Sequence, residues 1–84
     1  MEEKLIGKIT HFFSNINVGI IELSNGFKVG DKIHIKGSTT DIEQEVDSMQ
    51  VEHQNIEKAK KGDVVGLKVK DKVKEGDKVY LIIE

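Results

Sequence analysis

Residues 28–36 read Lys-Val-Gly-Asp-Lys-Ile-His-Ile-Lys, and this stretch contains the pattern that decides the fold. Over residues 32–36 polar or charged side chains alternate strictly with isoleucine, which predicts a half-buried β-strand. The preceding Gly30-Asp31 pair predicts a tight turn, because glycine accepts a positive φ angle and aspartate accepts backbone hydrogen bonds. The stretch therefore predicts a turn that leads directly into a strand.

The same pattern of turn and strand occurs along the rest of the chain. Two more Gly-Asp pairs, Gly62-Asp63 and Gly76-Asp77, each precede a strand-like segment. Residues 16–23 are apolar on both faces, which predicts a central strand covered on two sides. Other alternating segments lie at residues 5–13, 65–70 and 78–83.

Two segments interrupt this regularity. Over residues 43–53 a fixed period of two cannot bury Val46 together with Met49 and Val51, so we expect a bulge or bend near residues 47–48. Residues 55–61 resemble a short helical turn, with asparagine as a cap at the start, two lysines at the end and glycine after it.

Together these elements predict an all-β chain in which residues 1–84 form one domain. Six to seven short strands with tight turns favour a small closed β-barrel, with one short helical turn near 55–61. Closure is attractive because it removes unpaired strand edges, and the chain has no proline to protect an edge.

The composition excludes several classes of protein. The absence of cysteine excludes disulfide scaffolds, zinc ribbons, iron–sulfur clusters and thiol nucleophiles. The 13 basic residues are all lysine, and with 15 acidic residues the net charge is −2, so bulk charge does not attract DNA or RNA. No apolar run is long enough for a membrane helix, and the acidic start is unlike a secretory signal. We therefore expect a cytoplasmic protein with no membrane or DNA partner.

The sequence contains no recognisable catalytic motif. It has neither a phosphate-binding loop, nor a dinucleotide fingerprint, nor a nucleophile elbow. The three histidines, His11, His34 and His53, have no partner at metal-binding spacing, although strands could bring them together in space. We expect a protein that is not an enzyme and that has no cofactor and no metal site.

The second half of the chain resembles the second domain of translational GTPases, the β-barrel that follows the GTP-binding domain in elongation factor Tu. The similarity is carried by Val29-Gly30-Asp31, by residues 45–53 and above all by residues 59–66, Ala-Lys-Lys-Gly-Asp-Val-Val-Gly. The resemblance implies a barrel of the translation-factor domain 2 type standing alone. Similar barrels also occur as C-terminal domains of collagenase-like peptidases and RNA-modification proteins.

The resemblance implies a non-catalytic module for accessory binding of RNA or ribonucleoprotein in translation, with tRNA, rRNA or the ribosome as partner. Gln50 stands where the family has an acidic residue near the terminal adenosine of tRNA, and the family's arginine on the second strand has no counterpart. Outward lysines either bind RNA or simply keep the strands soluble. The candidate RNA-binding residues are Lys32, Lys36, Gln50, Lys60, Lys61, Lys68 and Lys70.

The alternative is a protein-interaction domain. Tyr80 and Ile82 alternate with Val79, Leu81 and Ile83, so both faces of the last strand are apolar, and Phe12 adds an apolar residue on the first strand. An exposed apolar patch marks a contact surface, unless residues 55–61 or the N-terminus cover it. The expected partner is a GTPase, a peptidase-like or RNA-modification protein, or a second copy, bound through Phe12, Tyr80 and Ile82.

Overall fold

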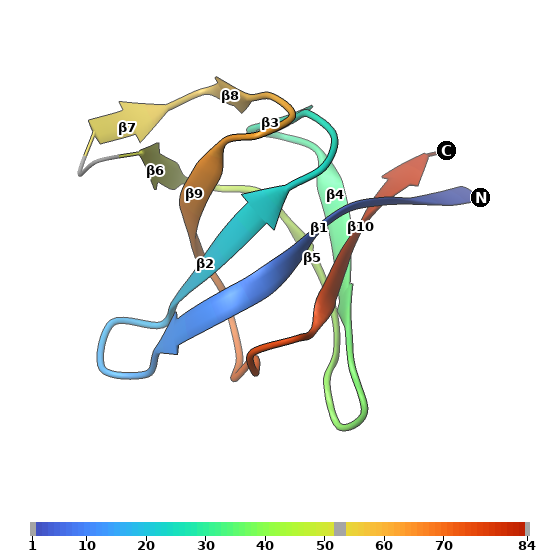
Figure 1. Cartoon of the computed structure of the whole chain (residues 1–84), viewed down its shortest axis with the longest axis vertical. Helices are drawn as coiled ribbons and strands as arrows, with labels where there is room; N and C mark the ends of the chain where they lie inside the picture. Colours follow the sequence, from blue (N-terminus) through green and yellow to red (C-terminus); the bar gives the residue numbers. More distant parts are fainter. Residues whose placement is uncertain (1, 52–53, 84) are drawn as a thin grey trace.

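The computed structural model describes residues 2–51 and 54–83, and within these residues it contains strands and no helix. The prediction of an all-β chain is therefore confirmed. The strands, drawn in Figure 1, are β1 (Glu2–Phe13), β2 (Val18–Leu23), β3 (Phe27–Lys28), β4 (Lys32–Lys36), β5 (Asp41–Glu45), β6 (Met49–Val51), β7 (Gln54–Ile56), β8 (Lys58–Ala59), β9 (Val64–Lys68) and β10 (Lys78–Ile83).

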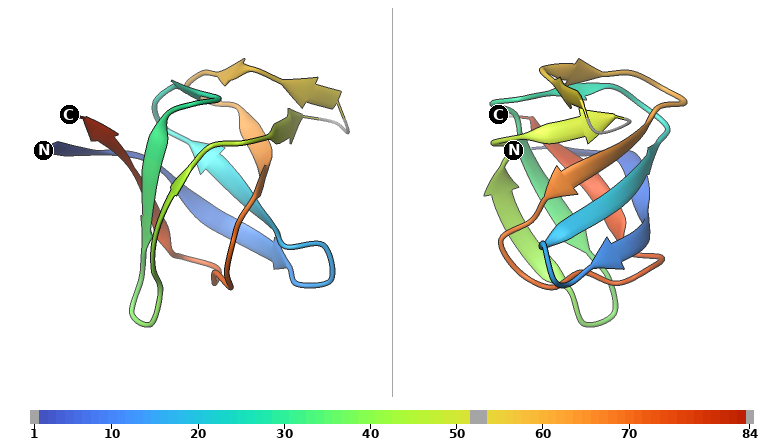
Figure 2. Two further views of the ribbon diagram at one scale, coloured as in Figure 1. Left: turned by 180° about the vertical axis from the view of Figure 1, so that it is seen from behind. Right: turned by 90° about the vertical axis from the view of Figure 1, so that its left-hand side faces the viewer.

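Eight of these strands form one antiparallel sheet in the order β5-β4-β10-β1-β2-β9-β6-β7. The remaining two, β3 and β8, pair with each other through Phe27 and Ala59. Figures 1 and 2 show that the large sheet is strongly curled, with the β3–β8 pair across one end. The core lies inside this curve, because inward-facing isoleucines and valines from opposite walls meet there.

The closed barrel is not confirmed, because no backbone pairing among the described residues joins the two end strands, β5 and β7. A side chain connects β5 to the neighbouring wall instead. The Gln44 amide donates from Nε2 to the Lys68 carbonyl at 2.9 Å, and its Oε1 accepts from the Lys70 N–H at 3.0 Å. The sheet is therefore curled, and one glutamine bridges its two sides.

The predicted helical turn at 55–61 is wrong. Gln54–Ile56 forms β7 and pairs with β6, and Lys58–Ala59 forms β8 and pairs with β3. Ala59 is buried against the core, so pairing across the chain stabilises an extended backbone. A helix of one or two turns is marginal in water by itself, and this tertiary pairing overrides its local propensity.

The first strand departs from a simple period of two. Its register shifts between Leu5 and Gly7 against β10, and between Ile9 and His11 against β2. These irregularities allow Ile6 and Ile9, three residues apart, both to be fully buried. After the second shift Phe12 faces inward and packs against the core.

The predicted Gly-Asp turns are confirmed. Gly30, Gly62 and Gly76 have φ angles of +97°, +91° and +90°, which favour glycine. In each turn the following aspartate accepts a hydrogen bond from the backbone N–H three residues before it, at 2.8–3.0 Å. The expected bend near residues 47–48 is also present, because β5 ends at Glu45 and β6 begins at Met49, which leaves both Val46 and Met49 buried.

Candidate functional site

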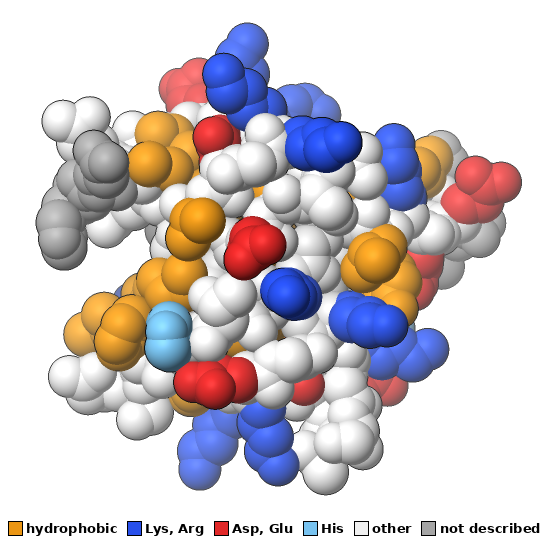
Figure 3. All heavy atoms as spheres, viewed as in Figure 1, with side chains coloured by type: hydrophobic (Ala, Val, Ile, Leu, Met, Phe, Trp, Pro, Cys, Tyr) orange, Lys and Arg blue, Asp and Glu red, His pale blue; other side chains and the backbone are white. Residues whose placement is uncertain are grey.

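A groove runs over the outer face of β2, β9 and β6, where Figure 3 shows apolar side chains gathered around a hollow at the left of the molecule. Its volume is about 560 Å³. It is formed by residues from four strands, β1, β2, β6 and β9, and from two turns. The lining residues are Phe13, Ile16, Val18, Ile20, Gln50, Val51, Gly62, Asp63, Val64, Val65 and Gly66.

Gly66 forms the low floor of this groove. In the sheet it lies between Ile20 of β2 and Gln50 of β6. A Cβ atom at this position would lie 3.3 Å from Val18 Cγ1 and 3.6 Å from Ile20 Cδ1, which means that any larger side chain would occupy the hollow. The missing side chain therefore lets a ligand approach the backbone of the sheet.

The rim of the groove is apolar and open to solvent. Phe13, Ile16 and Val64 have 47%, 53% and 52% of their surface exposed. The ring of His11 lies beside that of Phe13, with the centroids 6.5 Å apart. Exposed apolar residues that gather around a concavity mark a contact surface.

Polar groups in the groove are few and already engaged. The Asp63 carboxylate accepts a hydrogen bond from the Lys60 N–H at 3.0 Å. The Gln50 amide donates to Asn55 Oδ1 at 3.0 Å. Among the described lining residues there is no histidine, cysteine or serine, and no second carboxylate beside Asp63. This chemistry suits the binding of apolar groups.

The candidate RNA-binding residues are spread over the molecule. Gln50 lies in the groove. Lys68 and Lys70 line a separate hollow that also contains Glu45 and Asp47, so acidic residues accompany them. The exposed Lys60 and Lys61 precede Gly62 at one end of the groove. Lys32 and Lys36 lie at the two ends of β4, and three strands separate β4 from β9 in the sheet.

The candidate interface residues fall on two faces. Phe12 faces inward, as described above, whereas Tyr80 and Ile82 are half-buried on the outer face of β10. Tyr80 lies opposite His34 in the register of β10 and β4. The structure therefore does not bring Phe12 together with the other two residues.

Sequence reasoning missed the groove itself. It singled out Gln50 but not Phe13, Ile16 or Val64. The available signal was the segment 16–23, whose apolar residues occupy both faces. That pattern indicated a strand covered on two sides, whereas the structure leaves the outer side of Val18 and Ile20 half-open at the groove.

The chain is similar in sequence to parts of proteins described as a protease and a collagenase. No protein-family model matches the chain. An uncharacterized protease of Methanocaldococcus jannaschii is 46% identical over 80 residues, which are 94% of this chain and 20% of the relative. A collagenase of Porphyromonas gingivalis is 38% identical over 81 residues, which are 94% of this chain and 22% of the relative. The chain thus spans about a fifth of the length of these curated relatives.

A solved structure has the same fold. The C-terminal domain of a Geobacillus thermoleovorans protein described as a U32 peptidase superposes with a TM-score of 0.88. The match covers 95% of this chain and 93% of that domain at 16% sequence identity, so it establishes the fold alone. These relatives are peptidase- and collagenase-like, which fits the peptidase-like barrels named above; they give no support to tRNA, rRNA or the ribosome as partner. Within the described residues, no helix has the length and hydropathy to span a membrane.

Proposed function

We propose that the chain is a non-catalytic β-domain of a U32 peptidase- or collagenase-like protein, and that its groove docks an apolar segment of the peptidase-like unit. The observation that carries the proposal is the exposed apolar rim around Gly66. The curated relatives have about four fifths of their length outside the match, so a much larger unit accompanies the equivalent domain in those proteins.

The chemistry of the groove supports an apolar partner over a nucleic acid. RNA recognition relies on cationic contacts with phosphates and on aromatic stacking. Here the only charged residue among the described lining residues is an aspartate, and Phe13 is the only aromatic one. The aliphatic remainder is suited to leucine-, valine- or phenylalanine-type side chains of a protein segment. A catalytic role has no support from these residues, because no nucleophile and base lie together there.

The proposal can be tested by calorimetric titration of the 84-residue chain with the M. jannaschii protease produced without its 80 matching residues. We expect Val64→Ser to weaken binding at least tenfold, because it removes an apolar group from the rim. Phe13→Ser should have a similar effect. Circular dichroism of both partners establishes that each is folded.

Val29→Ser provides a matched control, because Val29 is also an exposed valine, at 36%, and lies outside the groove. This variant should bind like the original chain. Equal affinity of all three variants would contradict the proposal, as would the absence of binding between two folded partners. A parallel titration with tRNA tests the RNA alternative, whose affinity should fall steeply with salt.

A further inference from the structure

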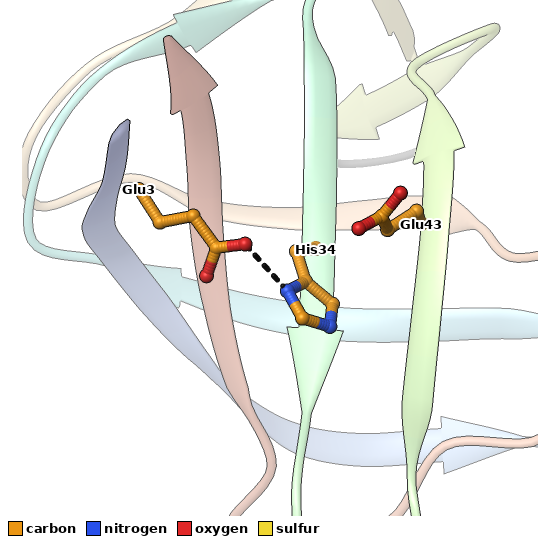
Figure 4. A group of neighbouring side chains, drawn as sticks. All are labelled: Glu3, His34 and Glu43. Carbon is orange, nitrogen blue, oxygen red and sulfur yellow. Dashed lines mark hydrogen bonds and ion pairs between the residues drawn. The ribbon is translucent and has the colours of Figure 1, made fainter. Parts of the chain in front are cut away.

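A second group of functional side chains lies on a different part of the outer surface. Figure 4 shows Glu3 of β1 and Glu43 of β5 on either side of His34 of β4. One ligand atom from each residue lies within 4.8 Å of the others. The sheet brings them together because β4 pairs with β5 directly and β10 alone separates β4 from β1.

His34 is unusual for its position. It faces the outside of the sheet, as its cross-strand partners Tyr80 and Glu43 do, yet only 7% of its surface is exposed. Its Nδ1 atom is 2.8 Å from Glu3 Oε2, and its Nε2 atom contacts the Asp41 carboxylate. The two carboxylates hold the plane of the imidazole and raise its pKa, chiefly because the Asp41 carboxylate accepts a hydrogen bond from the ring.

We propose that Glu3, His34 and Glu43 bind a divalent cation of the Zn²⁺ type. Imidazole nitrogen and carboxylate oxygens are ligands that Zn²⁺ accepts, at bond lengths of about 2.0–2.2 Å. Tetrahedral bonds of that length place the ligand atoms about 3.4 Å apart. The glutamates are exposed, flexible side chains that can close to this distance around the fixed imidazole.

Asp41 supplies the supporting contact that such a site needs. A histidine that binds a metal through one nitrogen usually donates the N–H of the other to a carboxylate, which fixes the ring and its tautomer. With the metal at Nδ1, the contact between Nε2 and Asp41 serves that purpose. The charge of the site also favours a metal ion. The carboxylates of Glu3, Asp41 and Glu43 surround one imidazole, and a dication neutralises more of their negative charge than a single proton does.

Isothermal titration of the 84-residue chain with Zn²⁺, and of the same chain with Co²⁺ followed by visible absorption, tests this proposal. We expect one ion per chain, and a shift of the His34 ring nitrogens in nitrogen-15 NMR spectra. Glu3→Gln and Glu43→Gln each remove one ligand and should weaken binding at least tenfold. Asp41→Asn should weaken it about tenfold or more through the orientation of the ring.

Two variants serve as matched controls. Glu45→Gln changes the next outward glutamate of β5, and His11→Gln disrupts the exposed His11–Glu75 pair elsewhere on the surface. Both should bind Zn²⁺ like the original chain. Either of two results would overturn the proposal: no shift of the His34 nitrogens at tenfold excess of Zn²⁺, or undiminished binding by both glutamine variants at Glu3 and Glu43. The first would leave His34 as an imidazolium held between two carboxylates.

Discussion

Two parts of the outer surface differ in how exposed their outward-facing residues are. Over β2, β9 and β6 the outward positions that line the groove are mostly apolar, with Gln50 as the polar exception, and the surface stays open around Gly66. Around His34, on β1, β4 and β5, charged side chains predominate, and Glu3, Asp41 and Glu43 lie beside the ring, which is only 7% exposed. The polarity of an outward-facing residue therefore does not decide how exposed that residue is. The length of the side chains on the neighbouring strands decides it, because long side chains can cover the residue between them.

The comparison predicts different roles for two glycines. A Cβ atom at Gly7 would lie 2.6 Å from the Glu22 carbonyl oxygen and 2.8 Å from Ile21 Cγ2. Because backbone cannot give way, Gly7→Ala should lower the free energy of unfolding by roughly 2–3 kcal/mol. At Gly66 an added Cβ atom would be tight only against the Val18 Cγ1 methyl, at 3.3 Å, so we expect Gly66→Ala to change the free energy of unfolding by no more than about 0.5 kcal/mol.

Urea unfolding of both variants measures the difference. A large loss of stability in Gly66→Ala would mean that this glycine is needed for the packing of β9 and not for keeping the groove open. In that case the groove would be a by-product of the fold. Equal, small effects would instead show that β1 can relax away from Glu22.

Much of the fold could be predicted from the sequence, because strands and turns depend on local patterns. The strand over 32–36 and the positive φ angles of Gly30, Gly62 and Gly76 follow from residue type and spacing alone. The bulges of β1 and the two short strands at 54–56 and 58–59 could not, since they arise from pairing with β2, β10, β3 and β6. Local preference is weak where distant strands compete for the same backbone.

The sites were less predictable, because each joins residues that are distant in sequence. Glu3 and His34 are 31 positions apart, and nothing in the spacing of the histidines indicates their contact. His53 lies outside the described residues. Gly66 belonged to the segment that resembles translation factors, but its role as the groove floor depends on Ile20 and Gln50 from neighbouring strands.

The buried histidine should make stability depend on pH, whereas the apolar groove should not. The contacts with Asp41 and Glu3 raise the pKa of His34 above its ordinary value of 6.5. The folded state thus binds the proton more tightly than the unfolded state does. This stabilisation is complete below about pH 6.5 and is lost as the pH rises through the raised pKa.

Urea unfolding with a chelator present, at steps from pH 6 to pH 9, should show the free energy of unfolding falling as the pH increases. His34→Gln should remove most of this slope, and Val64→Ser in the groove should keep it. A slope that persists in His34→Gln would assign the effect to another group.

Two glutamines extend the comparison to a smaller expected effect on stability, because one of them holds two parts of the sheet together and the other lies in the groove. Gln44 bridges β5 to the backbone of Lys68 and Lys70, whereas the side chain of Gln50 in the groove donates to the Asn55 side chain, its one hydrogen-bond partner among residues 2–51 and 54–83. Gln44→Ala should cost about 1–2 kcal/mol, since two hydrogen bonds are lost. Gln50→Ala should cost less than about 0.5 kcal/mol. Hydrogen exchange should show faster opening of β5 in the first variant only; equal protection in both would contradict the bridging role of Gln44.

The smallest effect is expected from the two lysines of the separate hollow, Lys68 and Lys70. Lys68 and Lys70 are exposed and share their hollow with Glu45 and Asp47, so the double change to glutamate should alter stability by no more than about 0.5 kcal/mol. Docking of the apolar partner should change less than twofold, and it should also vary little between about 50 and 200 mM salt, because no ion pair carries it. RNA binding through these lysines would instead weaken steeply over that range. If the double variant loses both tRNA retention and docking, the groove is part of a nucleic-acid surface and the contrast between an apolar and a charged face no longer holds.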